Sequence, residues 1–290
     1  NAILTTDTRI IKYSPTGNVL YNLPHSFVIH SATTDPNNNV LLTGKCGANT
    51  DLDPGSGVYK IPTLTSSSNY ISKLDSSGNL LWAKGLNGNF YNPIYPPNRL
   101  LSIDSAMNIY IAGTMKDSVD FNPDTTINTY LFSTHLNSPY IARYDAFGNY
   151  IGAKVIDIEG TVASMTVDGD QIIIAGTFKD TSDFDPGPGI TLLYDSANFF
   201  ICKFTASLDL AWAKNIGGKY SGNVSQINID ENSNIIATGS FPPNFTNNFK
   251  EFDLDPGPGL NLQYATGNGN ILICTLDSNG NFKSAHNLSA

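Results

Sequence analysis

The chain has 290 residues, of which only 14% are charged, and its formal net charge is −9. An acidic surface repels phosphate backbones, which argues against nucleic acid as a partner. No apolar run is long enough to cross a bilayer, so no membrane span is expected. Gly, Asn, Ser, Thr and Tyr are plentiful, and such a composition favours short strands joined by polar turns.

Internal repetition organises the chain from its N-terminus to its C-terminus. A phrase of Asn or Gln, three apolar residues, a small residue and Gly recurs along it. Each copy is followed by two more apolar phrases and preceded by one that ends in aspartate. Recurring phrases of this kind indicate a tandem array of one supersecondary unit. The Asn/Gln-to-Gly phrase occupies residues 39–44, 108–113, 171–176 and 234–239.

Each phrase is predicted to be a β-strand. The phrases are short, rich in Ile, Leu, Tyr, Phe and Val, and bounded by turn residues. Tight turns are expected at 104–108 and 230–234, between the first and second strands of a unit. Gly-containing hairpin turns are expected at 76–79 and 278–281, between the third and fourth strands. One unit is therefore four antiparallel strands.

Four-stranded units in tandem predict an all-β fold, a β-propeller. We expect one domain, 1–290, with five blades, of which the N-terminal blade is incomplete because residues 1–24 supply only three strands. The alternative is that the chain is a piece of a larger propeller or assembly. The expected blade units are approximately 1–24, 25–88, 98–157, 160–217 and 222–290.

Two sets of equivalent side chains are predicted to lie between neighbouring sheets. Isoleucines of the third strand should fill matching slots, and aromatic residues of the fourth strand should pack between blades rather than form a ligand platform. The isoleucines are Ile71, Ile141, Ile201 and Ile273. The aromatic residues are Tyr21, Trp82 and Trp212.

The long loop between the second and third strands carries the phrase Asp-x-Asp-Pro-Gly-x-Gly. In extended backbone, residues i and i+2 point the same way, so two carboxylates would converge beside the carbonyls of a Pro-Gly turn, an arrangement that suits Ca²⁺. The alternative is that these aspartates accept backbone N–H groups within the turn. No cofactor is otherwise required. The calcium candidates are Asp51, Asp53, Asp183, Asp185, Asp253 and Asp255, with a weaker copy at Asp120 and Asn122.

These phrases resemble the bacterial β-propeller repeats known as SBBP repeats. The resemblance rests on the strand that ends in Asp, the Asn-x-Tyr-x-x-Gly phrase at 108–113, the Tyr-Ile-x-Lys-Leu-Asp phrase at 70–75 and the Trp-Ala-Lys phrase at 82–84. The loop phrase at 183–189 looks like the variant found in secreted and surface proteins of Bacteroidetes and related bacteria. The resemblance covers essentially the whole chain. It implies a propeller in a secreted or cell-surface protein, and it implies no common activity and no catalytic residue set.

The sequence offers no catalytic residues. The only glutamates, Glu159, Glu231 and Glu251, do not occupy repeated positions, whereas a glycosidase needs two carboxylates facing one pocket. The inner strands instead carry Ser102, Thr166 and Asn228 at one shared position. The four histidines are scattered, with no spacing typical of metal ligands.

Two classes of function remain. The first is a non-enzymatic, secreted or cell-surface binding or scaffold module, monomeric, whose ligand is an extracellular glycan or protein. The second is a polysaccharide hydrolase or lyase with its site at the propeller axis. Binding aromatics are expected in the segments that break the repeat, because loops outside the repeat often carry specificity. The candidates are Tyr91, Tyr95, Phe245 and Phe249, for which packing over the blade ends is the alternative.

Three cysteines cannot form a complete set of disulfides, and Cys202 and Cys274 occupy equivalent places in successive units. Such places are usually too far apart to bridge. We expect buried thiols that act as small apolar side chains. The chain begins at Asn1 without Met, and we interpret it as a processed or trimmed form whose export signal lies outside this sequence.

Overall fold

The computed structural model of the chain describes residues 1–61, 65, 68–91, 100–194, 199–217, 223–241, 251–264 and 270–289. The regular structure in these ranges consists of β-strands, and no helix occurs there. Accordingly, no helix in the described ranges could cross a membrane. The all-β class predicted from the sequence is confirmed.

The chain forms five consecutive antiparallel meanders, here called units one to five. Unit one has three strands, β1 (Ala2–Thr5), β2 (Arg9–Tyr13) and β3 (Val19–Pro24), paired in that order. Residues 1–6 match the second-strand phrase of the other units. Unit one therefore lacks the strand that comes first elsewhere, as the sequence predicts.

Units two and three each have the predicted order of four strands, and a further pairing joins them. The second half of β7 continues past its own unit and pairs with the second half of β9, where Asn87 lies opposite Asp120. The two units thus share one large sheet. Their strands are β4 (Ser31–Thr34), β5 (Val40–Cys46), β6 (Ser68–Leu74) and β7 (Leu80–Tyr91), then β8 (Leu101–Ile103), β9 (Ile109–Asp120), β11 (Ser138–Tyr144) and β12 (Tyr150–Val155).

Units four and five are separate four-stranded sheets in which each strand pairs with the next in the unit. The loop between the second and third strands adds a short hairpin outside each main sheet, and in unit three a short strand, β10, pairs with β9. The main strands are β13 (Gly160–Asp168), β14 (Gln171–Phe178), β17 (Phe199–Phe204), β18 (Leu210–Ile216), β19 (Asn223–Ile229), β20 (Ile235–Phe241), β23 (Asn270–Leu276) and β24 (Phe282–Ser289). The added strands are β10 (Tyr130–Phe132), β15 (Ser182–Asp183), β16 (Leu192–Leu193), β21 (Glu251–Asp253) and β22 (Leu262–Tyr264).

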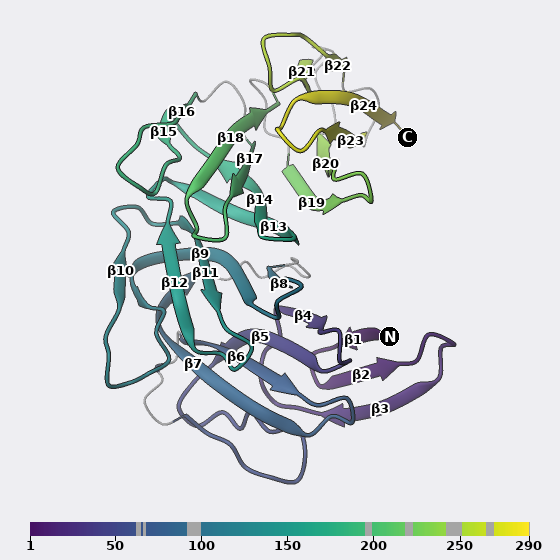
Figure 1. The fold of residues 1–290 in the computed structure, drawn as a ribbon, viewed down its shortest axis with the longest axis vertical. Coiled ribbons are helices and arrows are strands. Elements are labelled where there is room, and N and C mark those ends of the chain that lie inside the picture. The colour runs from purple at the N-terminus through teal and green to yellow at the C-terminus, as the bar shows by residue number, and fades with distance from the viewer. Residues whose placement is uncertain are drawn as a thin grey trace.

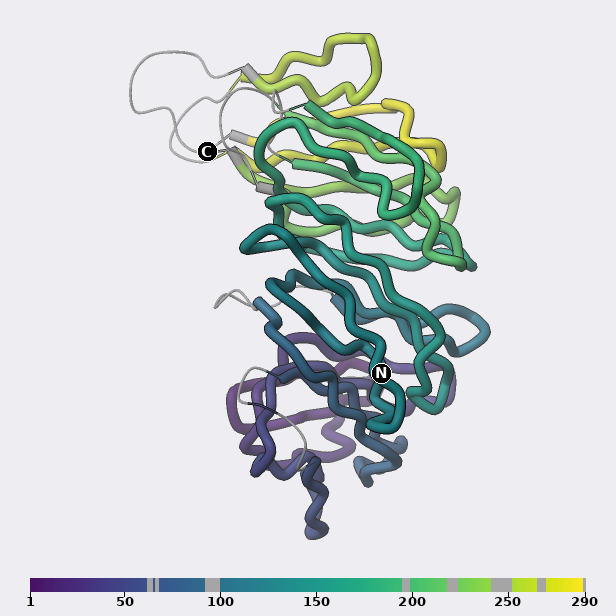
Figure 2. Tube along the Cα trace, turned by 90° about the vertical axis from the view of Figure 1, so that its left-hand side faces the viewer, coloured from purple at the N-terminus to yellow at the C-terminus, as the bar shows by residue number. Residues whose placement is uncertain are grey.

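The five units follow one another along an arc, from β1–β3 at one end to β19–β24 at the other (Figure 1). Seen from the side, the sheets succeed each other along the long axis of the molecule (Figure 2). The innermost strands of neighbouring units lie together, β1 against β4, β4 against β8, β8 against β13 and β13 against β19. The described strands of the first and last sheets do not pack extensively on each other.

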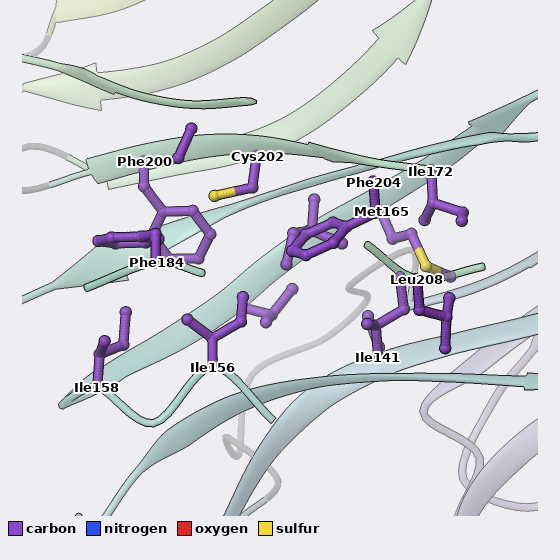
Figure 3. Packing of buried hydrophobic residues seen from close by; sticks show 14 of the residues in the cluster. Ile141, Ile156, Ile158, Met165, Ile172, Phe184, Phe200, Cys202, Phe204 and Leu208 are labelled. Atoms are coloured by element: carbon purple, nitrogen blue, oxygen red, sulfur yellow. The ribbon is translucent and has the colours of Figure 1, made fainter. Parts of the chain in front are cut away.

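The hydrophobic core lies between neighbouring sheets. Figure 3 shows the junction of units three and four, where Ile141 shares one apolar cluster with Phe204 and Leu208. Ile71, Ile141 and Ile201 are fully buried as predicted, and each such side chain contributes about 2 kcal/mol to folding. Ile273 is only half-buried, because no further described sheet covers the outer face of unit five.

A size-matched contact joins each unit to the next. An aromatic side chain on the fourth strand covers a turn glycine of the following unit, so a Cβ built on that glycine would lie 2.8 Å from Trp82 at Gly148 and 3.2 Å from Trp212 at Gly280. Tyr21 and Leu23 cover Gly78 in the same way. The aromatic residues thus pack between units, as predicted.

At the junction of units three and four, the small residue is on the fourth strand and the large residue is in the turn of the following unit. Gly152 occupies the position of Trp82, and the following turn carries Leu208 at the position of the glycine. Leu208 is buried and adopts a φ of 65°. Its Cδ1 atom lies 3.8 Å from a Cβ built on Gly152. A large residue therefore always meets a small one across these four junctions.

A cation of the third strand, buried at Lys12 and Lys203 and half-buried at Arg143, adds a polar contact at three of the four junctions. Lys12 donates to the Ser76 carbonyl at 3.0 Å, and Lys203 donates to the Ser278 carbonyl at 2.6 Å. Arg143 makes the equivalent bond to the Ala206 carbonyl at 2.7 Å. Lys73 instead forms a salt bridge of 2.9 Å with Asp35 of its own unit. Buried charges need such partners, so these bonds fix how one sheet sits on the next.

The tight turns share the pattern Asp-x-x-x-Asn. In the turn at 145–149, Oδ1 of Asp145 accepts the backbone N–H groups of Phe147 and Asn149, and Oδ2 accepts Nδ2 of Asn149. Burial raises the pKa of Asp145, but these hydrogen bonds outweigh it and leave the pKa below 3.8. The same bonds recur in the turns at 35–39, 75–79, 230–234 and 277–281.

The exchanged junction can be tested by a double-mutant cycle. Gly152→Trp alone should clash with Leu208, and Leu208→Gly alone should leave a void, each costing about 1–3 kcal/mol. The double variant should restore the arrangement seen at Trp82 and Gly148, with a coupling energy of about 1 kcal/mol or more. Urea unfolding of the four proteins measures this, and strict additivity would contradict the size-matching argument.

Stability should fall in acid because of the Asp-x-x-x-Asn turns. The folded pKa of Asp145 is depressed, so its contribution is present above the unfolded pKa and is lost as pH falls below about 4. Asn149→Ala removes one donor to Asp145 and should lower Tm by about 2–4 °C at pH 7. Melting curves from pH 7 to pH 2 should show this difference shrinking in acid. A pH-independent difference would show that the charge of Asp145 does not matter.

Candidate functional site

The innermost strands of all five units line one cavity of about 320 Å³. Every unit contributes residues to its lining. The sheet order dictates this, because the first strand of each meander faces the interior of the arc (Figure 1). Its polar lining comprises Asn1, Thr33, Thr34, Ser102, Thr166 and Asn228.

Four of the six polar lining residues share one register position. Ser102, Thr166 and Asn228 each lie two residues before the aspartate that ends the inner strand. The prediction that they occupy equivalent inner positions is confirmed, because all three line the cavity. Thr33 stands in the same register before Asp35, but the looser phrase of unit two concealed it. All four residues can be found in the sequence by counting back two positions from the aspartate at the end of each inner strand.

The cavity is chemically neutral. Hydroxyl and amide groups donate and accept hydrogen bonds without carrying charge. Apolar side chains lie between them, among them Ile3, Leu101 and Met165. A mixture of neutral polar groups and apolar surface suits a sugar or a peptide segment better than an ionic ligand.

The aspartates that end the inner strands are occupied by turn contacts. Asp104 accepts Nδ2 of Asn108 at 2.7 Å and the hydroxyl of Tyr110 at 3.0 Å. Burial raises the pKa of Asp35, but hydrogen bonds from Lys73 and Asn39 lower it by a larger amount. The net result is a pKa below the ordinary value for Asp. The lowered pKa of Asp35 suits a carboxylate that stabilises a turn and does not suit a proton donor.

The Asp-x-Asp-Pro-Gly-x-Gly loops are held by their own aspartates. Oδ1 of Asp183 accepts the N–H groups of Asp185, at 3.1 Å, and of Thr191, at 2.7 Å. Oδ1 of Asp185 accepts the N–H of Gly187 at 2.7 Å. The residue between the aspartates, Phe184, is fully buried in the core. The first aspartate therefore joins the two ends of the loop while the intervening side chain anchors it.

The loops of units two and five repeat these contacts, and the loop of unit three keeps the first of them. Asp51 and Asp53 form the matching bonds in unit two, and Asp253 and Asp255 form them in unit five. Asp120 accepts the N–H groups of Asn122 and Thr129. The alternative interpretation of these aspartates, as acceptors within a turn, is confirmed. Within the described residues no group of three or more His, Cys, Asp or Glu side chains could hold a metal. Calcium binding through two carboxylates and carbonyls stays a prediction.

Only one of the four aromatic candidates lies in the described structure. Tyr91 is the last residue of β7 and is 46% exposed. Tyr95, Phe245 and Phe249 fall outside the described residues. The structure thus leaves the role of these aromatics a prediction.

The three cysteines are unpaired and buried, as predicted. Burial raises the pKa of the Cys46 thiol, and that of the Cys274 thiol, to about 12. A thiol with so high a pKa carries almost no thiolate at neutral pH and is a poor nucleophile. These residues act as small apolar side chains.

Comparison with known proteins gives a distant likeness among solved structures. No protein-family model matches the chain, and no curated protein matches it. Among solved structures, the chain is similar to a protein of unknown function from Bacteroides caccae, with a TM-score of 0.47 and 12% sequence identity. The likeness covers 99% of this chain and 77% of that chain.

Two variants can distinguish a turn-stabilising role of the loop aspartates from a calcium-binding role. Asp183→Asn with Asp185→Asn keeps both acceptor oxygens for the turn but removes two charges, whereas Asp183→Ala removes the acceptor as well. We expect Asp183→Ala to cost about 1–3 kcal/mol by leaving backbone donors unpaired, and the Asn pair to cost less. If the loop binds calcium, the Asn pair should also abolish any rise in Tm with added calcium. Melting curves in calcium and in chelator measure both effects, and identical curves for the unsubstituted protein would refute calcium binding.

Proposed function

We propose that the chain is a non-catalytic, secreted or cell-surface binding module, built as a five-bladed β-propeller with a three-stranded first blade. Five meanders in arc order, each turning its first strand inward, support the propeller geometry. The resemblance to SBBP repeats supports the extracellular location. On this proposal the cavity at the axis is the ligand site.

The neutral lining of the cavity carries the proposal. Every unit contributes to this site, and the equivalent side chains Thr33, Ser102, Thr166 and Asn228 bear only hydroxyl or amide groups. A cavity of about 320 Å³ admits a sugar residue or a few residues of extended peptide. The ligand class is therefore an extracellular glycan or protein segment.

The competing function is a polysaccharide hydrolase or lyase acting at the axis. That mechanism needs paired carboxylates facing the cavity, one of them protonated. The nearest acidic groups, such as Asp35 and Asp104, are engaged in turn contacts. This arrangement favours binding over catalysis.

A glycan array and a polysaccharide-hydrolysis panel, run on the same protein, test the proposal. We expect glycan binding or no response on the array, and no release of reducing ends from any substrate. Ser102→Phe together with Thr166→Phe should fill the cavity and weaken binding at least about tenfold, because a ring replaces two polar lining groups. Ser77→Phe, at an exposed turn, is the matched control and should bind normally. Release of reducing ends that Ser102→Phe abolishes would establish the hydrolase instead.

A further inference from the structure

The loops that follow the second strands of units three to five expose apolar side chains at equivalent positions. In each loop a large apolar residue lies opposite the first aspartate, and an aromatic residue follows two positions later. Residues two apart on a strand point to the same face, so each loop turns a pair of large side chains outward. These side chains are 39–71% exposed. The outward pairs are Tyr130 with Phe132, Leu192 with Tyr194, and Leu262 with Tyr264.

Buried neighbours, rather than the outward pairs, anchor these loops to the core. Phe184 and Leu193 belong to the apolar cluster between units three and four, and Phe252 belongs to the cluster between units four and five. Large apolar residues scattered singly over a surface are common. Here they recur in register in three consecutive units, and such a gathering of exposed apolar groups indicates a surface for recognition.

Fixed contacts hold the aromatic residues against the main sheets. Nδ2 of Asn215 on β18 donates to the backbone carbonyl of Tyr194 at 3.1 Å, and Nδ2 of Asn287 on β24 donates to that of Tyr264 at 2.8 Å. In unit three, β10 is itself part of the main sheet, because it pairs with β9. The backbone that carries each ring is thus positioned before a ligand binds, which lowers the entropic cost of binding.

The chemistry of the outward pairs favours an uncharged ligand. None of the six side chains is charged, although the chain has 16 basic and 25 acidic residues. The net charge of −9 disfavours anionic polymers and anionic membranes. The partly exposed neighbours Thr191, Asn261 and Gln263 carry hydroxyl or amide groups. The faces of aromatic rings attract the C–H groups of a sugar ring, and neutral polar groups bind its hydroxyls.

The arrangement of the pairs favours a polymer over a compact protein partner. Figure 1 shows β10, β15–β16 and β21–β22 on the outer side of three successive units. These strands do not pack extensively on one another, so the pairs belong to separate projections. A compact protein needs a contiguous patch of about 800 Å². A polymer can instead contact each pair with a different part of its chain, and several weak contacts then combine into useful affinity.

We propose that the outward pairs of units three to five form a second binding site, which takes a neutral polysaccharide. A sugar ring stacks on each of the aromatic residues Phe132, Tyr194 and Tyr264, and the apolar residue two positions earlier widens each contact. The sugar chain follows the outer side of the arc from unit three to unit five. This site is separate from the axial cavity, so it goes beyond the proposed function and can be tested separately.

The test uses the full chain and affinity electrophoresis in gels that contain a soluble β-glucan, galactomannan or arabinoxylan. We expect at least one of these neutral polysaccharides to retard the protein. Phe132→Ser with Tyr194→Ser and Tyr264→Ser should weaken this binding at least about tenfold, and each single substitution should weaken it less, because the three contacts act together. The cavity variant, Ser102→Phe with Thr166→Phe, should be retarded normally. The matched control replaces three other exposed apolar residues and should also be retarded normally: Leu20→Ser, Leu81→Ser and Phe147→Ser.

Several results would overturn the proposal. They are no retardation by any of the three polysaccharides, retardation that the triple aromatic variant retains, and retardation that the cavity variant loses, which would assign binding to the axis. Cosedimentation with phosphatidylcholine vesicles and sedimentation analysis of self-association examine the other occupants. If the triple aromatic variant loses vesicle binding or self-association while no polysaccharide binds, the occupant is a lipid surface or a second copy of the chain.

Discussion

The arrangement of the sheets depends on the contact between one unit's outer strands and the next unit's turn. At three junctions a cation on the third strand donates to a turn carbonyl of the next unit. At each junction a large residue also packs on a small one: the large residue is on the fourth strand at three junctions and in the turn at the junction of units three and four. The size-matched contact needs two units, and three of the four third-strand cations at these junctions take their carbonyl from the next unit, whereas Lys73 pairs with Asp35 of its own unit. Because a buried cation without a partner is costly, a shift of one sheet along another would be penalised at every such junction.

The same contact explains why the two ends of the array differ. Unit five carries Thr275 where other units carry Lys or Arg, and Ser284 where units one, two and four carry an aromatic residue. It thus lacks both groups that would engage a following sheet. Unit one retains a complete receiving turn, with Gly17 at a φ of 83°, but no side chain covers it. Unit five therefore lacks the side chains that make the other junctions, whereas unit one has the turn glycine but no described side chain over it.

The repeat phrases made the main strands and their order predictable from sequence, because periodicity and turn chemistry act locally. The inner register of Ser102, Thr166 and Asn228 was predictable for the same reason. The fusion of units two and three was not, since it depends on β7 continuing beyond its phrase and pairing with β9. Nor was the exchange of Gly152 and Leu208, because neither residue alone shows a pattern; only the neighbouring sheet makes them complementary.

The aspartates show how a fold can be strongly acidic without an acidic active site. The chain has 25 Asp and Glu residues. In the described turns, aspartate oxygens accept hydrogen bonds from backbone N–H groups two to nine residues away. Such a carboxylate stabilises its turn as an anion, which lowers its pKa and removes it from acid–base chemistry, as at Asp145. The cavity, by contrast, is lined by hydroxyl-bearing, amide-bearing and apolar side chains, with no Asp, Glu, Lys or Arg among the residues that line it. In the described residues, negative charge thus serves the connections between strands rather than the cavity to which all five units contribute.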